Sequence, residues 1–165
     1  MIIAPPTNII TETIRKQLSD ALRERHAHAR FEDAVENLPA EFRTVKPDSL
    51  PYSIWQLVEH IRITQWDIVQ FCRFATHKSP DWPEGYWVEN PEQVSDEMWK
   101  NSLNQIWDDR ELFIALLNNP DIDIYLPFTH GNGQNYIREA LLMADHTGYH
   151  TGQIILIRRL LGDWK

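Results

Sequence analysis

Two histidines four residues apart, His146 and His150, are the strongest candidates for chemistry in this sequence. They lie in a segment with helical apolar periodicity, and residues four apart lie one turn above each other on the same helix face. Both imidazoles can therefore reach one point, which is how a helix offers two ligands to a metal ion. Their stripe also carries Leu142, Gln153 and Ile157, so we expect it to face the interior. Burying unsatisfied imidazole nitrogens would cost roughly 1–3 kcal/mol each, a cost that a metal ion removes.

His60 is the third candidate, because it lies in the middle of a second predicted amphipathic helix. It shares a helical stripe with Leu57 and Phe71. The midpoints of two helices can face each other in a bundle, so His60 is placed to complete a three-histidine site. From the residues alone, a metal site and a hydrogen-bonded core cluster both stay open as interpretations.

Two better-known metal schemes do not fit the sequence. A zincin needs Glu directly after the first histidine of the pair, and position 147 is Thr. A ferritin-like di-iron centre needs two Glu-x-x-His pairs on facing helices, and the sequence contains none. Three imidazoles suit zinc, nickel, iron or copper alike, so the residues do not select the ion.

Four long amphipathic patterns must position these histidines. The first pattern runs from about Thr7 to Leu38, with a bend expected near residues 26–28. The second begins at a capping box of Ser53 and Gln56 and fades near residue 75. These two patterns predict the first half of a helical domain.

The third pattern begins after a predicted cap at Ser95 and ends at Asn118. The fourth runs from about Tyr136 to Leu161 and stops at Gly162. The loops between the patterns are long, and the loop over residues 121–134 contains a short β-like piece at residues 122–126. The sequence thus predicts one all-α domain over residues 1–165, a four-helix bundle in up-down-up-down order.

Composition excludes several classes of function. The net charge of −8 opposes nucleic-acid binding and a polybasic membrane anchor. No apolar run approaches the roughly 18 residues that span a bilayer, and the first residues do not resemble a secretory signal. The single cysteine, Cys72, favours a reducing compartment. We therefore expect a cytoplasmic domain that binds neither nucleic acid nor membrane.

The other four histidines are predicted to be incidental. We expect His26 and His28 to be solvated or to form capping hydrogen bonds, and His130 to serve a turn. His77 follows the second predicted helix, where we expect it to bind terminal carbonyls.

For further polar and aromatic residues the sequence predicts structural or surface positions. Cys72 is expected to be a small core residue, while Asp67 and Glu139 are expected at the surface. Trp82 and Trp87 are expected to anchor a loop, with a place at a pocket mouth as the alternative.

Two segments carry a resemblance to a known family. His146-Thr-Gly-Tyr-His150-Thr-Gly-Gln-Ile154, continued by residues 156–164, resembles the closing helix of the DinB-like superfamily of metalloenzymes. Residues 51–60 resemble its second helix, where a serine-led cap precedes the first metal histidine. The resemblance covers essentially the whole chain in element order. Asn135 stands where relatives often have a capping Thr.

The resemblance implies a four-helix bundle, commonly a homodimer, with a divalent metal held by His60, His146 and His150. Some relatives transfer low-molecular-weight thiols such as bacillithiol or mycothiol, and others resemble hydrolases. A metal on three neutral imidazoles keeps its charge and an open position, so it can lower the pKa of a bound water to about 7 or hold a thiolate. Gln153 is placed to orient a ligand or a bound water.

The leading hypothesis is therefore a zinc, nickel or iron enzyme that activates a thiol or water for a small-molecule substrate. Thiol S-transfer, with a low-molecular-weight thiol as cosubstrate, is the favoured reaction, and hydrolysis is the second. The alternative is a non-catalytic metal-binding or stress-related interaction module. No residue is identified as a general base.

Overall fold

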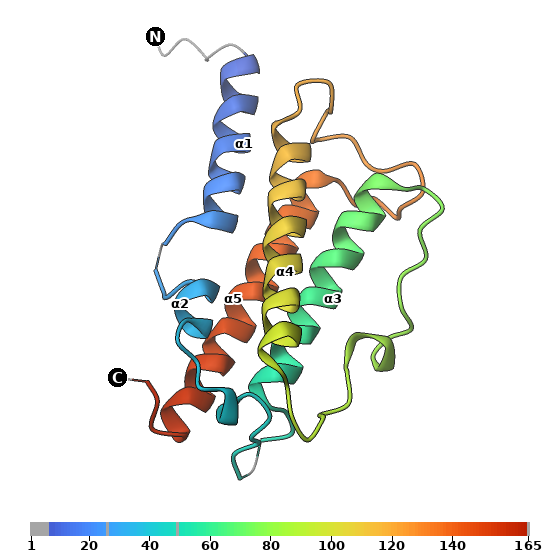
Figure 1. The fold of residues 1–165 in the computed structure, drawn as a ribbon. Helices are drawn as coiled ribbons and strands as arrows, with labels where there is room; N and C mark the ends of the chain where they lie inside the picture. The colour runs from blue at the N-terminus through green and yellow to red at the C-terminus, as the bar shows by residue number, and fades with distance from the viewer. Residues whose placement is uncertain (1–6, 26, 49, 165) are drawn as a thin grey trace.

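The computed structural model describes residues 7–25, 27–48 and 50–164, and this part of the chain is a helical bundle without strands (Figure 1). The predicted all-α class is therefore confirmed. The helices are α1 (Thr7–Arg23), α2 (Phe31–Val35), α3 (Ile54–Arg73), α4 (Asp96–Asn118) and α5 (Tyr136–Leu160), with 3₁₀ turns η1 (Ala40–Phe42) and η2 (Glu84–Tyr86).

The single N-terminal helix predicted to reach Leu38 is wrong, because α1 ends at Arg23 and α2 begins only at Phe31. Asp33 explains the restart. Its carboxylate accepts the Arg30 backbone N–H at 2.9 Å, which supplies a partner for a free donor at the new helix start. The interval between α1 and α2 is therefore wider than the bend expected at residues 26–28.

The predicted helix starts are confirmed. Ser53 Oγ accepts the Gln56 backbone N–H at 3.2 Å, and Gln56 Oε1 accepts the Ser53 N–H at 3.2 Å, which completes the capping box of α3. Ser95 caps α4 through the Met98 N–H. Asn135 caps α5 by accepting the Arg138 N–H at 2.9 Å.

The C-terminal stop of α5 is also where the sequence places it. Gly162 has a φ of +75°, a value that L side chains rarely adopt. This turn lets the Asp163 N–H donate to the Arg158 carbonyl at 2.8 Å, as in a Schellman motif.

The direction of α4 differs from the predicted alternation. Trp55 of α3 lies beside Trp99 of α4, with ring centroids 6.4 Å apart, and further along Arg62 donates to Gln105 at 3.2 Å. Residue numbers rise together on both helices, so α3 and α4 are parallel. The order is therefore up-down-down-up, because residues 74–95 run back along the bundle before α4 begins (Figure 1).

By contrast, α3 and α5 are antiparallel. Tyr136 at the start of α5 donates its hydroxyl to the Cys72 carbonyl near the end of α3, at 3.1 Å. His146, further along α5, lies against His60, which is earlier in α3. This pairing brings the midpoints of the two histidine-bearing helices together, as the sequence predicts.

The β-like piece predicted at residues 122–126 is not a strand. Asp123 Oδ1 accepts the Tyr125 N–H at 2.9 Å, which closes a side-chain turn instead of a ladder. Ile124 is fully buried and plugs the end of the bundle. Of residues 122–126 only Ile124 is buried, so the strand-like alternation of apolar residues belongs to a turn with one core residue.

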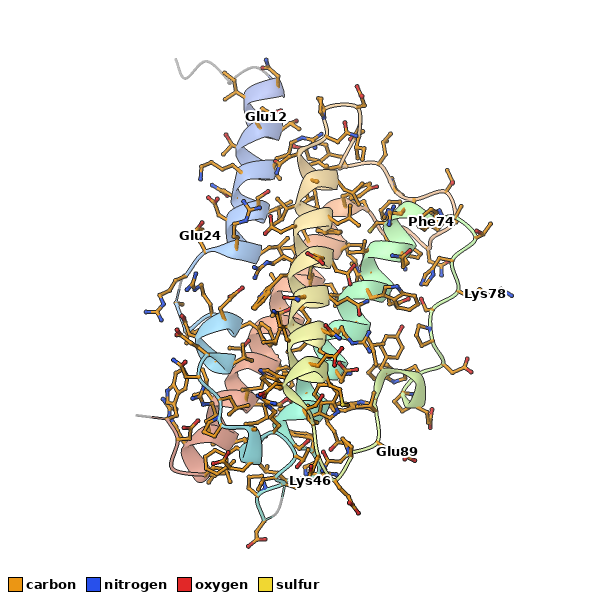
Figure 2. All side chains as sticks on the ribbon, in the orientation of Figure 1. Glu12, Glu24, Lys46, Phe74, Lys78 and Glu89 are labelled. Atoms are coloured by element: carbon orange, nitrogen blue, oxygen red, sulfur yellow. The ribbon has the colours of Figure 1, made fainter. Side chains whose placement is uncertain are left out.

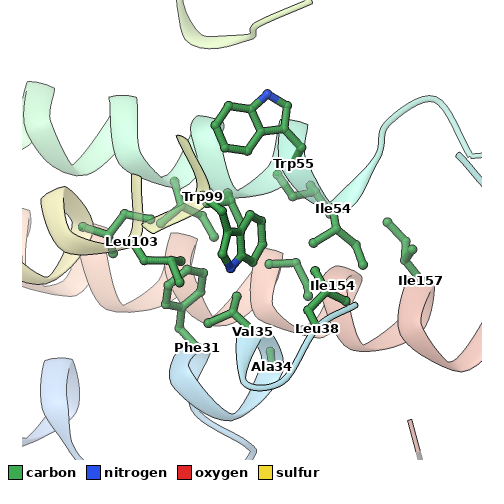
Figure 3. Close-up of a cluster of buried hydrophobic side chains, with 14 of the residues drawn as sticks. Phe31, Ala34, Val35, Leu38, Ile54, Trp55, Trp99, Leu103, Ile154 and Ile157 are labelled. Atoms are coloured by element: carbon green, nitrogen blue, oxygen red, sulfur yellow. The ribbon is translucent and has the colours of Figure 1, made fainter. Parts of the chain in front are cut away.

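The apolar core is divided into two clusters. One joins α2 to the first half of α3, the first half of α4 and the last part of α5, and Figure 3 shows its members Phe31, Ile54, Trp99 and Ile154 pointing toward one another. The other lies at the opposite end, around Phe113. Some of the buried polar side chains lie on the interior turns of α3, α4 and α5: Glu59, His60, Gln65, Asp109, His150 and Thr151. This polar set includes two of the three histidines that the sequence singles out.

The exterior is charged. Figure 2 shows Glu12, Glu24, Lys46, Lys78 and Glu89 pointing away from the helices, and each is exposed. None of the described helices is long and apolar enough to cross a bilayer.

Candidate metal centre

The structure brings together the three histidines that the sequence singles out. His60 comes from α3, and His146 and His150 come from α5. One ring nitrogen from each lies within 4.8 Å of the others, which is a group able to hold a metal ion. His60 and His150 are buried, and His146 is half-buried.

The helix geometry accounts for this convergence. On α5 the rings of His146 and His150 have centroids 4.4 Å apart, as expected for residues one turn apart. The His60 ring lies 4.8 Å from the His146 ring and 4.7 Å from the His150 ring. The three imidazoles thus form a compact triangle between two antiparallel helices.

Hydrogen bonds at the outer nitrogens fix two of the tautomers. The Tyr86 carbonyl lies 2.9 Å from His60 Nδ1, and a carbonyl can only accept, so Nδ1 carries the proton. His150 Nδ1 donates in the same way to Gln153 Oε1 at 2.6 Å. Nε2 of each ring therefore keeps its lone pair. In metal-ligating histidines, too, one ring nitrogen donates to a protein acceptor and leaves the other free to bind the metal.

The inner nitrogens of His60 and His146 lie close together. Their Nε2 atoms are 3.0 Å apart. Two nitrogens that share one zinc ion at tetrahedral angles, with Zn–N distances of about 2.0–2.1 Å, lie about 3.3 Å apart. The separation therefore fits a shared cation, and it also fits a hydrogen bond between the rings.

Burial keeps these imidazoles neutral. Removal from water lowers the pKa of His60 and of His150 below the ordinary histidine value. The pKa of His146 falls to about 3, first through burial and then through the neighbouring rings of His150 and His60. At neutral pH all three rings are therefore uncharged, the form in which histidine binds metals.

The loop after α3 forms one wall of the site. The Trp87 ring stacks on His60, with centroids 4.1 Å apart and planes 5° apart. Trp87 also stacks with Tyr52, with ring centroids 5.9 Å apart. Trp87 therefore packs as the sequence predicts, and its partner is the candidate ligand His60. Trp82, for which the same role is predicted, is instead 73% exposed.

Gln153 and two tyrosines border the side of His150. Gln153 donates from Nε2 to the Tyr52 hydroxyl at 2.7 Å, so both ends of its amide are engaged. The Tyr149 ring meets the edge of His150 at 5.0 Å and is 65% exposed. The site therefore lies close to the surface on this side.

Asp67 ties this loop to α3, a role that its predicted place at the surface does not suggest. Its Oδ2 accepts the Tyr86 hydroxyl at 2.6 Å, and its Oδ1 accepts from His77 Nε2 at 2.7 Å. The His77 side chain therefore binds a carboxylate, while its backbone N–H donates to the Phe74 carbonyl at the end of α3, at 3.0 Å. The same Tyr86 holds His60 through its backbone carbonyl.

The remaining candidates lie away from the triangle. His130 donates to the Phe71 carbonyl at 2.9 Å, which gives α3 the terminal contact that the sequence predicts for His77.

Glu139 is predicted at the surface, but it is 2% exposed, and burial raises its pKa. Cys72 is buried and free, as predicted. His28 is exposed, and His26 lies outside the described residues.

The sequence did not indicate the Tyr86 carbonyl or Tyr52, because each reaches the site through tertiary contacts. No motif marks a backbone carbonyl as a histidine partner. The aromatic content of residues 77–93 was the only available signal that this loop packs on something.

Comparison with known proteins identifies the family. The DinB superfamily matches residues 24–154, a range that contains all three histidines and most of the bundle. No curated protein and no solved structure matches the chain. With its family match and its helical bundle, the chain belongs to the DinB superfamily.

Proposed function

We propose that this protein is a metal-dependent enzyme that activates a low-molecular-weight thiol, or water, at the three-histidine cluster. The observation that carries the proposal is the convergence of His60, His146 and His150 within 4.8 Å, with two Nδ1 atoms bonded outward. With Nδ1 protonated, His60 and His150 each keep an Nε2 lone pair, which is the donor that a metal ion requires.

Zinc, nickel or iron fits the donor set, because neutral imidazole binds each of these divalent ions well. When bound, such an ion supplies positive charge that stabilises a thiolate or lowers the pKa of water. The chain's own residues orient the ligands: Tyr86 holds His60, and Gln153 holds His150.

Access to the cluster supports catalysis over a purely structural site. His146 is half-buried, and Tyr149 beside His150 is exposed, so a small molecule can approach from the side of α5. Thiol S-transfer is the favoured reaction, on the strength of the family resemblance. In it the thiol loses its proton, its sulfur bonds to an electrophilic carbon, and the leaving group departs with its electron pair.

Metal analysis of the purified protein tests the premise. We expect about one zinc, nickel or iron ion per chain in the wild type and a loss of most of it in His146→Ala. His130→Ala is the matched control, because His130 lies outside the cluster and is exposed. Equal metal content in wild type and His146→Ala, or none in the wild type after incubation with each ion, contradicts the proposal.

The reaction is tested by a screen of bacillithiol, mycothiol and simpler thiols against electrophiles, with ester and amide substrates alongside. Metal-dependent turnover that His146→Ala abolishes supports the enzyme. Bound metal without turnover in either screen supports the alternative, a non-catalytic metal-binding or stress-related module.

We also propose that the protein works as a homodimer in the cytoplasm. An apolar stripe on the outer face of α5 supports the dimer: Leu141, Leu156 and Leu160 are 56%, 47% and 58% exposed. Such a face commonly packs against another protein surface. The single cysteine, buried and free, suits a reducing compartment.

A further inference from the structure

The candidate ligand His60 is supported by a residue that contacts its own helix twice. The backbone carbonyl of Tyr86 accepts from His60 Nδ1 at 2.9 Å, and the Tyr86 hydroxyl donates to Asp67 Oδ2 at 2.6 Å. His60 and Asp67 are seven residues apart on α3, so they lie on nearly the same helix face, about 10 Å apart along the axis. Tyr86 therefore spans two turns of α3 and links the ligand to a distant carboxylate.

The hydroxyl end of this link is firmly held. A separation of 2.6 Å is typical of the strong hydrogen bonds that hydroxyl groups donate to carboxylates. Asp67 is itself fixed by His77, whose Nε2 lies 2.7 Å from Oδ1, and the two side chains are only 13% and 11% exposed. The Trp66 ring packs on the His77 ring with centroids 5.3 Å apart. The position of the Tyr86 hydroxyl is thus determined by side chains that are largely sheltered from water.

The turn that carries Tyr86 is compact. The Tyr86 backbone N–H donates to the Pro83 carbonyl at 3.1 Å, which closes the 3₁₀ turn η2. A Cβ atom on Gly85 would lie 2.7 Å from Pro80 Cβ, so the turn needs glycine at this close approach. Such packing leaves the Tyr86 backbone little freedom, and the position of its ring therefore determines the position of its carbonyl.

The next residues hold the loop in a second way. The Trp87 ring stacks on His60 at 4.1 Å, and Gln56 Nε2 donates to the Val88 carbonyl at 2.8 Å. Neither contact involves the Tyr86 ring. Loss of the hydroxyl contact should therefore leave the loop on α3 but release the ring of Tyr86, and with it the carbonyl that orients His60.

We propose that Asp67 is a positioning residue for the metal ligand His60 and that it acts through Tyr86. This role rests on the proposed metal function, because the orientation of His60 sets the direction of its donor nitrogen. Partners behind metal-ligating histidines fix the tautomer and the ring orientation, and their loss typically lowers metal affinity 10–100-fold. Asp67 acts one contact further from the metal, so we expect an effect of about tenfold, at the lower end of that range.

Nuclear magnetic resonance of the metal-free protein with isotope-labelled histidine tests the positioning directly. Tyr86→Phe removes only the hydroxyl, and it should accelerate solvent exchange of the His60 Nδ1 proton about tenfold, the ratio that one hydrogen bond provides. The Nδ1 proton of His150 should keep its wild-type rate, because Gln153 holds it. A residue that only stabilised the fold would change both rates alike.

Zinc titration against a chelating dye tests the consequence for the metal. Tyr86→Phe and Asp67→Ala should each bind zinc about tenfold more weakly than the wild type. The double variant should bind no more weakly than Asp67→Ala, because both changes break the same contact. Tyr125→Phe, which removes a hydroxyl bonded to Thr11 of α1, is the control and should match the wild type in both measurements.

Two results would overturn the proposal. Wild-type exchange of the His60 proton in Tyr86→Phe would mean that the contact at Val88 orients the carbonyl without Asp67. Additive losses of zinc affinity in the double variant would mean that Asp67 and Tyr86 act separately. A wild-type protein that binds no zinc would contradict the proposed function instead, and the exchange rates in the metal-free protein would still decide the role of Asp67.

Discussion

The protonation state of single side chains determines what the histidine cluster can bind. Burial lowers the pKa of all three histidines, and the pKa of His146 reaches about 3. The outward hydrogen bonds of His60 and His150 leave their inner nitrogens unprotonated. The site is therefore a set of neutral imidazoles, and protonation of these rings in the folded protein costs stability.

Acid should therefore destabilise the metal-free protein. In the unfolded chain His146 protonates near its ordinary pKa of about 6.5, whereas in the fold its pKa is about 3. Below pH 6.5 the unfolded state binds the extra proton, so stability is full above that pH and falls as pH drops toward 3. One such group contributes up to about 1.4 kcal/mol per pH unit.

Urea denaturation of the metal-free protein between pH 7.5 and pH 4.5 measures this slope, with His146→Gln as the comparison. The stability of the variant should depend less steeply on pH, because it lacks the His146 imidazole. Some dependence should remain, because the carboxylates titrate in both proteins. Identical slopes would show that His146 protonates freely in the fold.

Gln153 tests the outer contact of a single ligand. Gln153→Leu removes the acceptor for His150 Nδ1, so metal affinity should fall about 10–100-fold. Zinc titration against a chelating dye measures the affinity. Gln17→Leu, on the exposed face of α1, is the control and should bind zinc like the wild type. Unchanged affinity in Gln153→Leu would remove this residue from the site.

Helices and loops determine whether the three histidines meet. Antiparallel α3 and α5 bring their midpoints together, and residues 74–95 return along the bundle to cover His60. Asp67 holds that returning loop at two points, Tyr86 and His77. The loop is therefore part of the site's structure, and its anchor lies on α3.

Removal of this anchor should loosen the wall of the site. Asp67→Ala leaves the Tyr86 hydroxyl and His77 without their acceptor, so the free energy of unfolding should fall by about 1–3 kcal/mol. Hydrogen exchange should accelerate at the Trp87 amide. Asp81→Ala, an exposed carboxylate of the same loop, should change neither measurement. Slow exchange in Asp67→Ala would mean that apolar packing alone holds the loop.

The whole molecule is a bundle with two apolar clusters and a set of buried polar side chains that includes His60 and His150. The two apolar clusters stabilise the fold, and the histidine cluster lies between α3 and α5. Charged side chains lie on the exterior around this arrangement, and the exposed apolar side chains include the stripe on α5.

That stripe should be the dimer contact. Leu156→Lys places a charge in the middle of it, so the molar mass measured by light scattering should fall from that of two chains to that of one. Leu126→Lys, at a leucine outside α5 that is more exposed than Leu156, should leave the dimer intact. A wild-type protein that elutes as one chain would contradict the dimer directly.

Local patterns were sufficient for the helices and the ligand candidates. The caps at Ser53, Ser95 and Asn135, the stop at Gly162 and the four-residue histidine spacing act over one helical turn, so they can be recognised in the chain itself. The same patterns misjudged the first helix, because continuing apolar periodicity hid the new start that Asp33 creates.

Long-range contacts decided the rest. The parallel course of α3 and α4, the buried place of Glu139, the tie from Asp67 to the loop and the carbonyl behind His60 all depend on residues far apart in sequence. A helix pattern states which face is apolar, but it does not state which neighbour covers that face or in which direction the neighbour runs. Only the packed bundle could reveal which carbonyl holds His60 and that a separate cavity lies among α1, α2, α4 and α5.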